Sequence, residues 1–293
     1  MSKVPVSNSA YVDWNSCHRK YFNAYVLRLE SRRKGKALAI GIIGHDAMQA
    51  YYKSRRDGGS HTDSVREANQ LLTTYLYDRT DEFGMDHIMT VKRIHDAYYD
   101  FYGDDPNWEV LEVEKFYKLD LTDEFYMPMR LDLLIREIST NRIYIVDTKY
   151  TYDFWAPNDK SLSPQFPKYL ATLKANGIKV DGVIINQLRY RENAKQLFDR
   201  DKIPITDNKI RLNLTMHVTS AREIQNFHAQ PPYVQEQIAT RVLKAQTCKY
   251  CSFNDLCELE LDGSDTETFK LGKYQQKSYG YKDSDFDEQA AIK

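Results

Sequence analysis

An aspartate and a lysine stand two residues apart at the end of an apolar, β-branched run, NRIYIVDTKYTYDFW (residues 141–155). Because side chains alternate between the two faces of a strand, Asp147 and Lys149 share one face. Burying either charge costs several kcal/mol unless the charge is paired or holds a metal. The spacing therefore predicts either a structural ion pair or a metal ligand beside a catalytic ammonium.

A second carboxylate, Asp132, lies fifteen residues earlier in the stretch MRLDLLI. A tight turn separates the two strands, so we expect a hairpin with Asp132 and Asp147 side by side. Two adjacent carboxylates repel each other, and a divalent cation is the usual solution. Mg²⁺ binds one or two carboxylates together with substrate phosphate oxygens. Lys149 would then position or deprotonate the attacking water, or stabilise charge growing on the phosphate.

This arrangement, an Asp followed by Asp-x-Lys at the end of the next strand, resembles the PD-(D/E)XK nucleases. The stretch GIIGHDAM matches the Gly-x-x-x-His helix of their RecB-like branch, which implies that His45 binds metal together with the two aspartates. A lone helical histidine would by default be a core residue. Glu114, in LEVEKFY, falls where relatives often have a strand glutamate near the site, so the resemblance implies an assisting ligand there.

The stretch QFPKYLATL matches a second motif of the same branch, Gln-x-x-x-Tyr. Gln165 and Tyr169 are four residues apart and so lie on one face of a helix. The resemblance implies that both contact DNA near the metal. Relatives commonly carry a glycine shortly before the first aspartate, whereas MPMRLD has none, and Arg130 would reach a phosphate instead. The resemblance covers about residues 10–260.

Three of the four cysteines are clustered as C-x2-C-x5-C in TCKYCSFNDLC, and the fourth lies far upstream in SCHRKYF. A cytoplasmic chain rarely keeps disulfides, so four thiolates on one ion or cluster are the better explanation. The one-plus-three layout resembles the iron–sulfur clasp of RecB-like nucleases, including the AddB subunit and the CRISPR-associated adaptation exonuclease. It implies a structural 4Fe–4S cluster, while the spacing alone also allows Zn²⁺. The ligands would be Cys17, Cys248, Cys251 and Cys257.

Charge is distributed unevenly along a chain whose net charge is −1. Residues 18–36 carry seven Lys or Arg against one Glu, which predicts either a local contact with a polyanion or a solvated helix face. The residues expected to track DNA phosphates are Arg19, Lys20, Arg32 and Arg33. No run of 18 apolar residues and no signal-peptide core is present, so we expect a cytoplasmic protein without a membrane span.

The elements that position these residues follow a helix–sheet–helix order, which predicts an α/β fold with a restriction-endonuclease-like core. Its mixed central sheet would be flanked by helices, with helical N- and C-terminal additions joined by the cysteine cluster. The expected helices are 10–30, 36–56, 62–80, 87–103, 163–177 and 220–245. The expected strands are 108–121, 124–138, 142–150, 180–191 and 208–219.

We expect a single RecB-like nuclease domain over residues 1–261, followed by a polar, flexible tail over 262–293. Within the domain, the N-terminal helical part spans 10–105, the nuclease core 106–218, and the C-terminal helix with the cysteine clasp 219–261.

Together the motifs and the resemblance predict a nuclease that depends on Mg²⁺ or Mn²⁺ and acts on DNA, most simply an exonuclease on single-stranded ends. The alternative is a non-cleaving DNA-binding or scaffolding subunit of a helicase or recombination complex. The chain has no P-loop motif, Gly-x4-Gly-Lys-Ser/Thr. Any motor, such as a helicase or recombinase, would therefore be a partner.

Overall fold

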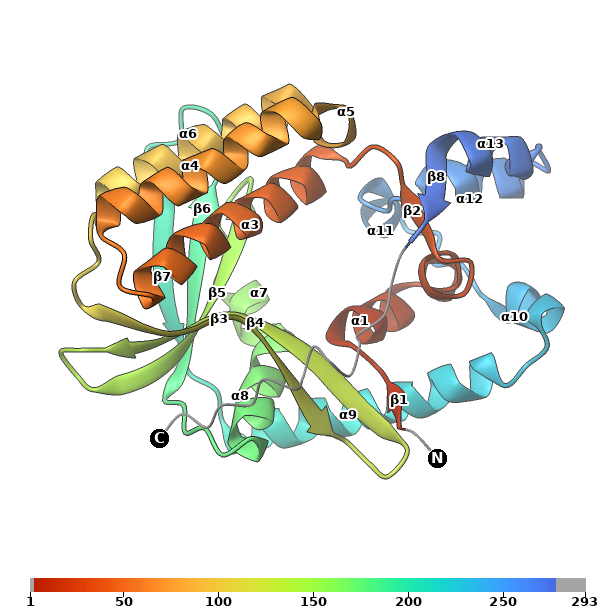
Figure 1. Cartoon of the computed structure of the whole chain (residues 1–293). Coiled ribbons are helices and arrows are strands. Elements are labelled where there is room, and N and C mark those ends of the chain that lie inside the picture. Colours follow the sequence, from red (N-terminus) through yellow and green to blue (C-terminus); the bar gives the residue numbers. More distant parts are fainter. Residues whose placement is uncertain (1–2, 278–293) are drawn as a thin grey trace. The chain divides into compact units, whose positions relative to one another are not determined.

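The computed structural model describes residues 3–277 (Figure 1). These residues form two compact units, which we call the sheet unit and the terminal unit. The sheet unit contains residues 34–117 and 129–210. The terminal unit contains residues 3–33, 118–128 and 211–277. Segments from both ends of the chain therefore fold together, and the sheet unit is built from the middle of the sequence.

Within residues 3–277, six strands form a mixed sheet in the order β1-β4-β5-β6-β7, with β3 paired to β4 (Figure 1). Strands β4 and β5 are antiparallel, β5 and β6 parallel, and β6 and β7 antiparallel. The strands are β1 (Val4–Pro5), β3 (Trp108–Asp120), β4 (Phe125–Glu137), β5 (Arg142–Thr151), β6 (Gly182–Arg189) and β7 (Phe198–Ile203).

Alternation along the strands gives the sheet unit a core on each face. On one face, Tyr144 and Val146 of β5 pack with residues of α3 (Lys36–Arg56), α4 (His61–Asp78) and α6 (Met85–Tyr102). On the other face, Ile145 packs with residues of α8 (Gln165–Ala175). Two short helices complete the unit, α5 (Thr80–Phe83) and α7 (Pro157–Leu162). This α/β architecture confirms the expected fold class, and the expected helices and strands between residues 36 and 191 are present.

The expected strand over residues 208–219 is wrong, because these residues belong to a helix, α9 (Asp207–His228). Thr206 caps its first turn by accepting a hydrogen bond from the amide of Lys209. The apolar alternation in this stretch does not mark a buried face. The buried side chains instead recur at helical spacing, at His217, Ser220, Ala221, Ile224 and Phe227. The sheet takes its last strand from β7, which the sequence analysis missed.

The expected helix over residues 10–30 is broken into shorter elements. Helix α1 (Asn8–Ser16) ends at Cys17, whose φ of −168° is extended. Helix α2 (His18–Tyr21) and the π-helix η1 (Phe22–Val26) follow, and β2 (Leu29–Ser31) completes the segment. The extended residue at position 17 separates the cysteine from both neighbouring helices.

The C-terminal part of the terminal unit is a series of short helices. After the Pro-Pro interruption come α10 (Pro232–Ile238), α11 (Ala245–Lys249), α12 (Asn254–Leu261) and α13 (Thr266–Lys273). Strand β8 (Tyr274–Gln276) then pairs antiparallel with β2.

Part of the stretch expected to be a flexible tail is therefore regular structure. Asp265 caps α13 by accepting from the amides of Glu267 and Thr268, and β8 is held by its pairing with β2. The rest of the expected tail, residues 278–293, lies outside the described residues. None of the described helices has the length and apolar character needed to cross a membrane.

Candidate functional site

The hairpin of β4 and β5 opens at the point where the motif residues lie. The ladder between the two strands runs as far as the pair Leu133 and Val146. Just beyond it, the Asp132 carboxylate accepts a hydrogen bond from the backbone amide of Thr148 at 2.9 Å. A side chain thus replaces a strand carbonyl as the acceptor, which fixes the carboxylate at the edge of the opening. His45 of α3 reaches the same carboxylate, with Nδ1 3.4 Å from Asp132 Oδ2.

Glu114 joins this pair because its backbone departs from regular strand geometry. Its φ is +51°, in the left-handed region that costs a residue with a side chain about 1–2 kcal/mol. Burial, with a further contribution from Asp132, raises the pKa of Glu114 to about 8. Arg130 Nε lies 2.8 Å from Glu114 Oε2, but not in hydrogen-bond alignment. This buried carboxylate oxygen therefore has an ion pair but no aligned hydrogen bond.

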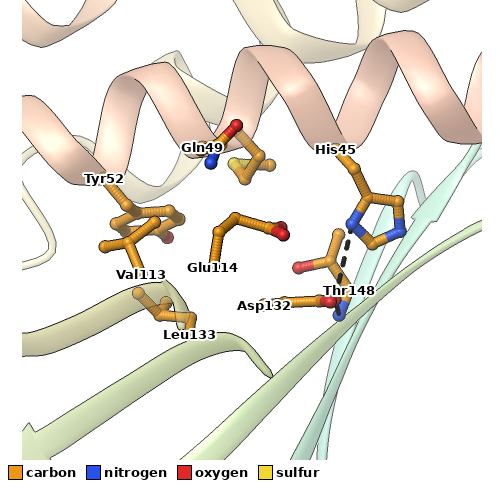
Figure 2. Close-up of a pocket in the computed structure, with 9 residues that line it drawn as sticks. His45, Gln49, Tyr52, Val113, Glu114, Asp132, Leu133 and Thr148 are labelled. Atoms are coloured by element: carbon orange, nitrogen blue, oxygen red, sulfur yellow. Dashed lines mark hydrogen bonds and ion pairs between the residues drawn. The ribbon is translucent and has the colours of Figure 1, made fainter. Parts of the chain in front are cut away.

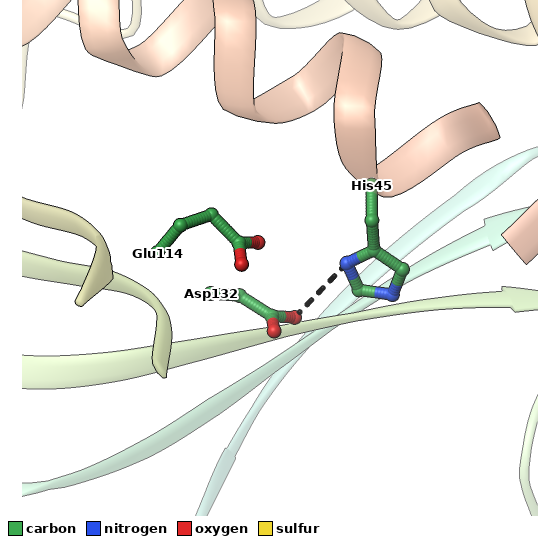
Figure 3. Close-up of side chains that lie close together, drawn as sticks. All are labelled: His45, Glu114 and Asp132. Carbon is green, nitrogen blue, oxygen red and sulfur yellow. Dashed lines mark ion pairs between the residues drawn. The ribbon is translucent and has the colours of Figure 1, made fainter. Parts of the chain in front are cut away.

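Three side chains from three elements converge on one point (Figure 2). A nitrogen of His45 and carboxylate oxygens of Glu114 and Asp132 all lie within 4.8 Å of one another (Figure 3). Two carboxylates and an imidazole are suitable ligands for Mg²⁺ or Mn²⁺. The surrounding pocket is lined further by Met48, Gln49, Tyr52, Val113, Leu133 and Thr148. The donor set, with two carboxylates and an imidazole close together, fits a divalent cation.

Asp147 and Lys149 form a second group on β5 together with α8. Asp147 is 1% exposed, and Lys149 Nζ lies 2.7 Å from its Oδ2. The Gln165 amide joins them, because it donates to Asp147 Oδ1 at 3.1 Å and accepts from Lys149 Nζ at 3.2 Å. The same amide contacts the hydroxyl of Tyr169. The two motifs Asp-x-Lys and Gln-x-x-x-Tyr are thus one hydrogen-bonded network.

The network sets the charge of Lys149. Burial alone would lower the pKa of this amine, but Asp147 and Asp132 outweigh it and hold the pKa above its ordinary value. Lys149 is therefore an ammonium at neutral pH. Asp147, expected as a metal ligand beside Asp132, instead turns its carboxylate to Lys149 and Gln165 and is not among the three residues that converge within 4.8 Å.

The position of His45 depends on residues that the sequence analysis did not single out. A Cβ atom added to Gly44 would lie 2.6 Å from two carbons of the Tyr150 ring and closer still to a third. The Tyr150 hydroxyl is in turn hydrogen-bonded to Nε2 of the buried His95 at 2.6 Å. The rings of His45 and Tyr150 meet edge to face at 5.6 Å. The second glycine of GIIGH was the one sequence signal for this close approach.

The residues expected to track DNA phosphates differ in exposure. Arg19 is 3% exposed, and its guanidinium binds both carboxylate oxygens of Glu260 at 3.0 and 2.5 Å. This places Arg19 in the interior of the terminal unit. Lys20 pairs with Asp13 at 2.6 Å. The exposed members of the set are Arg32 and Arg33.

All four cysteines belong to the terminal unit and are free, half-buried thiols. Burial raises the pKa of Cys251, and the nearby Cys17 and Cys248 raise it further. Burial likewise raises the pKa of Cys257, with a smaller contribution from Cys251. The four side chains thus lie in one neighbourhood, and Cys17 reaches it from the opposite end of the sequence.

Comparison with known proteins identifies the family. A family model described as the PD-(D/E)XK nuclease superfamily matches residues 5–258. Among solved structures, a “Putative exonuclease” from Eubacterium rectale is 16% identical, with 81% of this chain and 88% of that chain covered and a TM-score of 0.48. The crystal structure of SSO0001 is 14% identical, with 73% and 84% covered and a TM-score of 0.33. No curated protein matches the chain. Since the family model spans most of the sequence, the chain belongs to the PD-(D/E)XK nuclease superfamily.

Proposed function

We propose that this protein is a metal-dependent DNA exonuclease that acts on single-stranded ends and carries a structural 4Fe–4S cluster. The observation that carries the proposal is the convergence of His45, Glu114 and Asp132 on one point, close to a charged Lys149. A pocket that brings two carboxylates and an imidazole this close together suits a cation, and a phosphodiester brings the remaining oxygen ligands.

The metal would be Mg²⁺ or Mn²⁺, held by His45, Glu114 and Asp132, with Asp147 joining once its carboxylate turns from Lys149. When bound, such a cation supplies positive charge to a phosphodiester oxygen and makes a water molecule more acidic. Lys149, as an ammonium, donates hydrogen bonds to the phosphate or the water and stabilises negative charge as it develops.

Gln165 orients this ammonium and contacts the DNA strand beside it, whereas Tyr169, which is 6% exposed, supports the Gln165 amide. Lys20, Arg32 and Arg33 contact phosphates elsewhere along the DNA, whereas Arg19 serves the interior of the terminal unit.

The order of the cysteines along the chain supports a cluster rather than zinc. One cysteine precedes the sheet unit and three follow it, whereas a structural zinc ion usually takes its ligands as two close pairs. The cluster would fix Cys17 to the segment 248–257, a connection that the unfolded chain rarely makes.

The test uses anaerobically purified full-length protein, with its iron and zinc contents measured. End-labelled single-stranded and duplex DNA are incubated with Mg²⁺ or Mn²⁺, and the products are resolved over time. We compare wild type with Lys149→Ala and Asp147→Ala. Lys174→Ala serves as the matched control, because it removes the same side chain from an exposed position in the last turn of α8.

The proposal expects about four irons per chain, and stepwise shortening of single strands that the control retains and both site variants lose. Cleavage that survives Lys149→Ala and Asp147→Ala would refute the assigned site. A colourless protein loaded with zinc would refute the cluster. Protein that binds DNA without cutting it, alone and with a helicase or recombinase partner, would establish the scaffolding alternative.

A further inference from the structure

A group of aromatic and basic side chains lies where β5 and β6 end. These strands are parallel and side by side (Figure 1), and Thr151 and Arg189 are level in the register. The amide of Tyr190 still bonds the carbonyl of Thr151 at 2.9 Å. The chain therefore leaves both strands at the same level, and the residues that follow are held next to each other. We call this group the aromatic platform; it comprises Tyr152, Phe154 and Tyr190 with Lys36, Arg189 and Arg191.

The platform exposes ring surface. Tyr152 is 55% exposed, and its ring lies 5.9 Å from that of Tyr190. Arg191 sits 5.9 Å from the centre of the Tyr152 ring, and Arg189 lies over Phe154 at 3.9 Å. Rings flanked by guanidinium groups on a surface are the arrangement that stacks unpaired bases.

The charge of the platform also suits a nucleic acid. Asp153 pairs with Arg191 at 2.9 Å and lies 4.0 Å from Arg189, so it neutralises part of the positive charge. Lys36, in the first turn of α3, lies 5.9 Å from the centre of the Tyr190 ring and adds a cation from a second element. Three cations against one acid leave the platform a positive excess beside the exposed ring of Tyr152.

The platform is continuous with the proposed cleavage site. Lys149 precedes Thr151 by two residues, which is about 7 Å along a strand. Lys36 precedes His45 by nine residues in α3, which is about 13 Å along a helix axis. At roughly 3.4 Å for each stacked nucleotide, the second distance corresponds to about four nucleotides. A strand whose phosphodiester lies at the metal centre would thus bring its neighbouring bases over the platform.

We propose that the aromatic platform binds the unpaired bases of single-stranded DNA next to the cleavage site, and that Tyr152 is its principal stacking residue. This inference rests on the proposed function and adds a physical reason why the enzyme would prefer single-stranded to duplex DNA. In a duplex the base faces are already stacked on one another, so duplex DNA offers the platform only its phosphates. Single strands offer both phosphates and free base faces, and the platform therefore binds single-stranded DNA more tightly than duplex DNA.

The test measures binding in the absence of cleavage. All variants are made in a Lys149→Ala background, and their affinities for a fluorescent 15-mer of thymidine and for a duplex of the same length are determined by anisotropy. Tyr152→Ala should weaken single-strand binding about 5- to 150-fold, the range for losing one stacked base, and leave duplex binding within about twofold. Tyr152→Phe keeps the ring and should restore single-strand affinity. Tyr77→Ala is the matched control, because Tyr77 is 84% exposed on α4 outside the platform.

Affinity for Mn²⁺, measured by calorimetry, should be the same in Tyr152→Ala and its parent, which shows that the metal centre is intact. Single-strand binding that Tyr152→Ala leaves unchanged, or that weakens equally for duplex, would overturn the platform. Single-strand binding that depends on Tyr152 in a wild-type background that cleaves no DNA would refute the proposed function and leave the platform standing. Failure of the two proposals is thus distinguishable.

Discussion

Replacing Gly44 with alanine should displace His45, the proposed metal ligand. The added Cβ would meet carbons of the Tyr150 ring at 2.6 Å, whereas carbon atoms pack comfortably at about 3.5–4.0 Å. Tyr150 has little room to retreat, because its hydroxyl is held by the fully buried His95. The helix that carries His45 must therefore move by roughly 1 Å.

The control for this change lies one turn earlier in the same helix. A Cβ at Gly41 meets no atom within 4 Å. Both substitutions gain the helix propensity of alanine over glycine, about 1 kcal/mol, so their difference isolates the clash. Overpacking costs about 1–3 kcal/mol. We expect the free energy of unfolding of Gly44→Ala to lie below that of Gly41→Ala by about 1–3 kcal/mol, with a correspondingly lower unfolding midpoint.

Activity should respond more strongly than stability. A displacement of 1 Å at a catalytic group costs on the order of 100-fold in rate. We expect Gly44→Ala to lose about this factor in DNA cleavage and to bind Mn²⁺ more weakly in calorimetry. Equal unfolding midpoints for the two glycine variants, or a Gly44→Ala enzyme with wild-type cleavage and Mn²⁺ affinity, would refute the steric reasoning.

Three further predictions concern the surroundings of the site and the clasp. Burial, with a smaller effect of a neighbouring histidine, lowers the pKa of His95 to about 3, so the folded protein excludes a proton that the unfolded chain binds below about pH 6.5. When the pH is lowered from 7.5 to 5.5, the free energy of unfolding of the wild type, measured in urea, should therefore fall by about 1.4 kcal/mol more than that of His95→Gln. The same dependence on pH in both proteins would contradict a neutral His95 imidazole in the folded state. Gln165→Leu removes the hydrogen bonds to Lys149 and Asp147, so the rate of DNA cleavage should fall about 10- to 100-fold in steady-state assays while Mn²⁺ affinity is unchanged. A fully active variant would exclude a role for Gln165 as the bridge between these two charged groups. Glu260→Ala leaves the guanidinium groups of Arg19 and Arg241 without their shared carboxylate and should lower the free energy of unfolding by about 3–5 kcal/mol. Replacing the exposed Glu236 with alanine should lower it by less than about 1 kcal/mol. Equal losses in the two variants would argue against the buried network.

Much of the sheet unit could be predicted because its local signals agree with its tertiary contacts. The run around Ile145 is β-branched and becomes a buried strand, and the segment 36–56 becomes a helix with the expected bounds. Spacing nominated Asp132, and the resemblance to the PD-(D/E)XK nucleases nominated His45 and Glu114. The ligand atoms of all three converge in the structure. His45 and Asp132 are carried by a regular helix and a regular strand, which sequence patterns describe well.

The rest depends on geometry that no pattern encodes. Glu114 turns toward Asp132 through a left-handed backbone conformation within a strand, where a Glu gives no warning of it. In α9 the buried face includes His217 and Ser220, which sequence reasoning assigns to the surface, while Leu212 is 45% exposed. Tertiary contacts, rather than local propensity, decided both cases.

The division of the chain into two units has a consequence for its synthesis. Strand β2 pairs with β8, and Trp14, Tyr21 and Phe22 pack against residues near position 224. A ribosome that adds about 5–20 residues per second completes the sheet unit long before β8 emerges, so these early aromatic residues wait roughly 10–50 s for their partners. The nascent N-terminal segment therefore exposes apolar side chains until these partners have been synthesised, and Cys17 meets the other three cysteines only after residue 257 has been added.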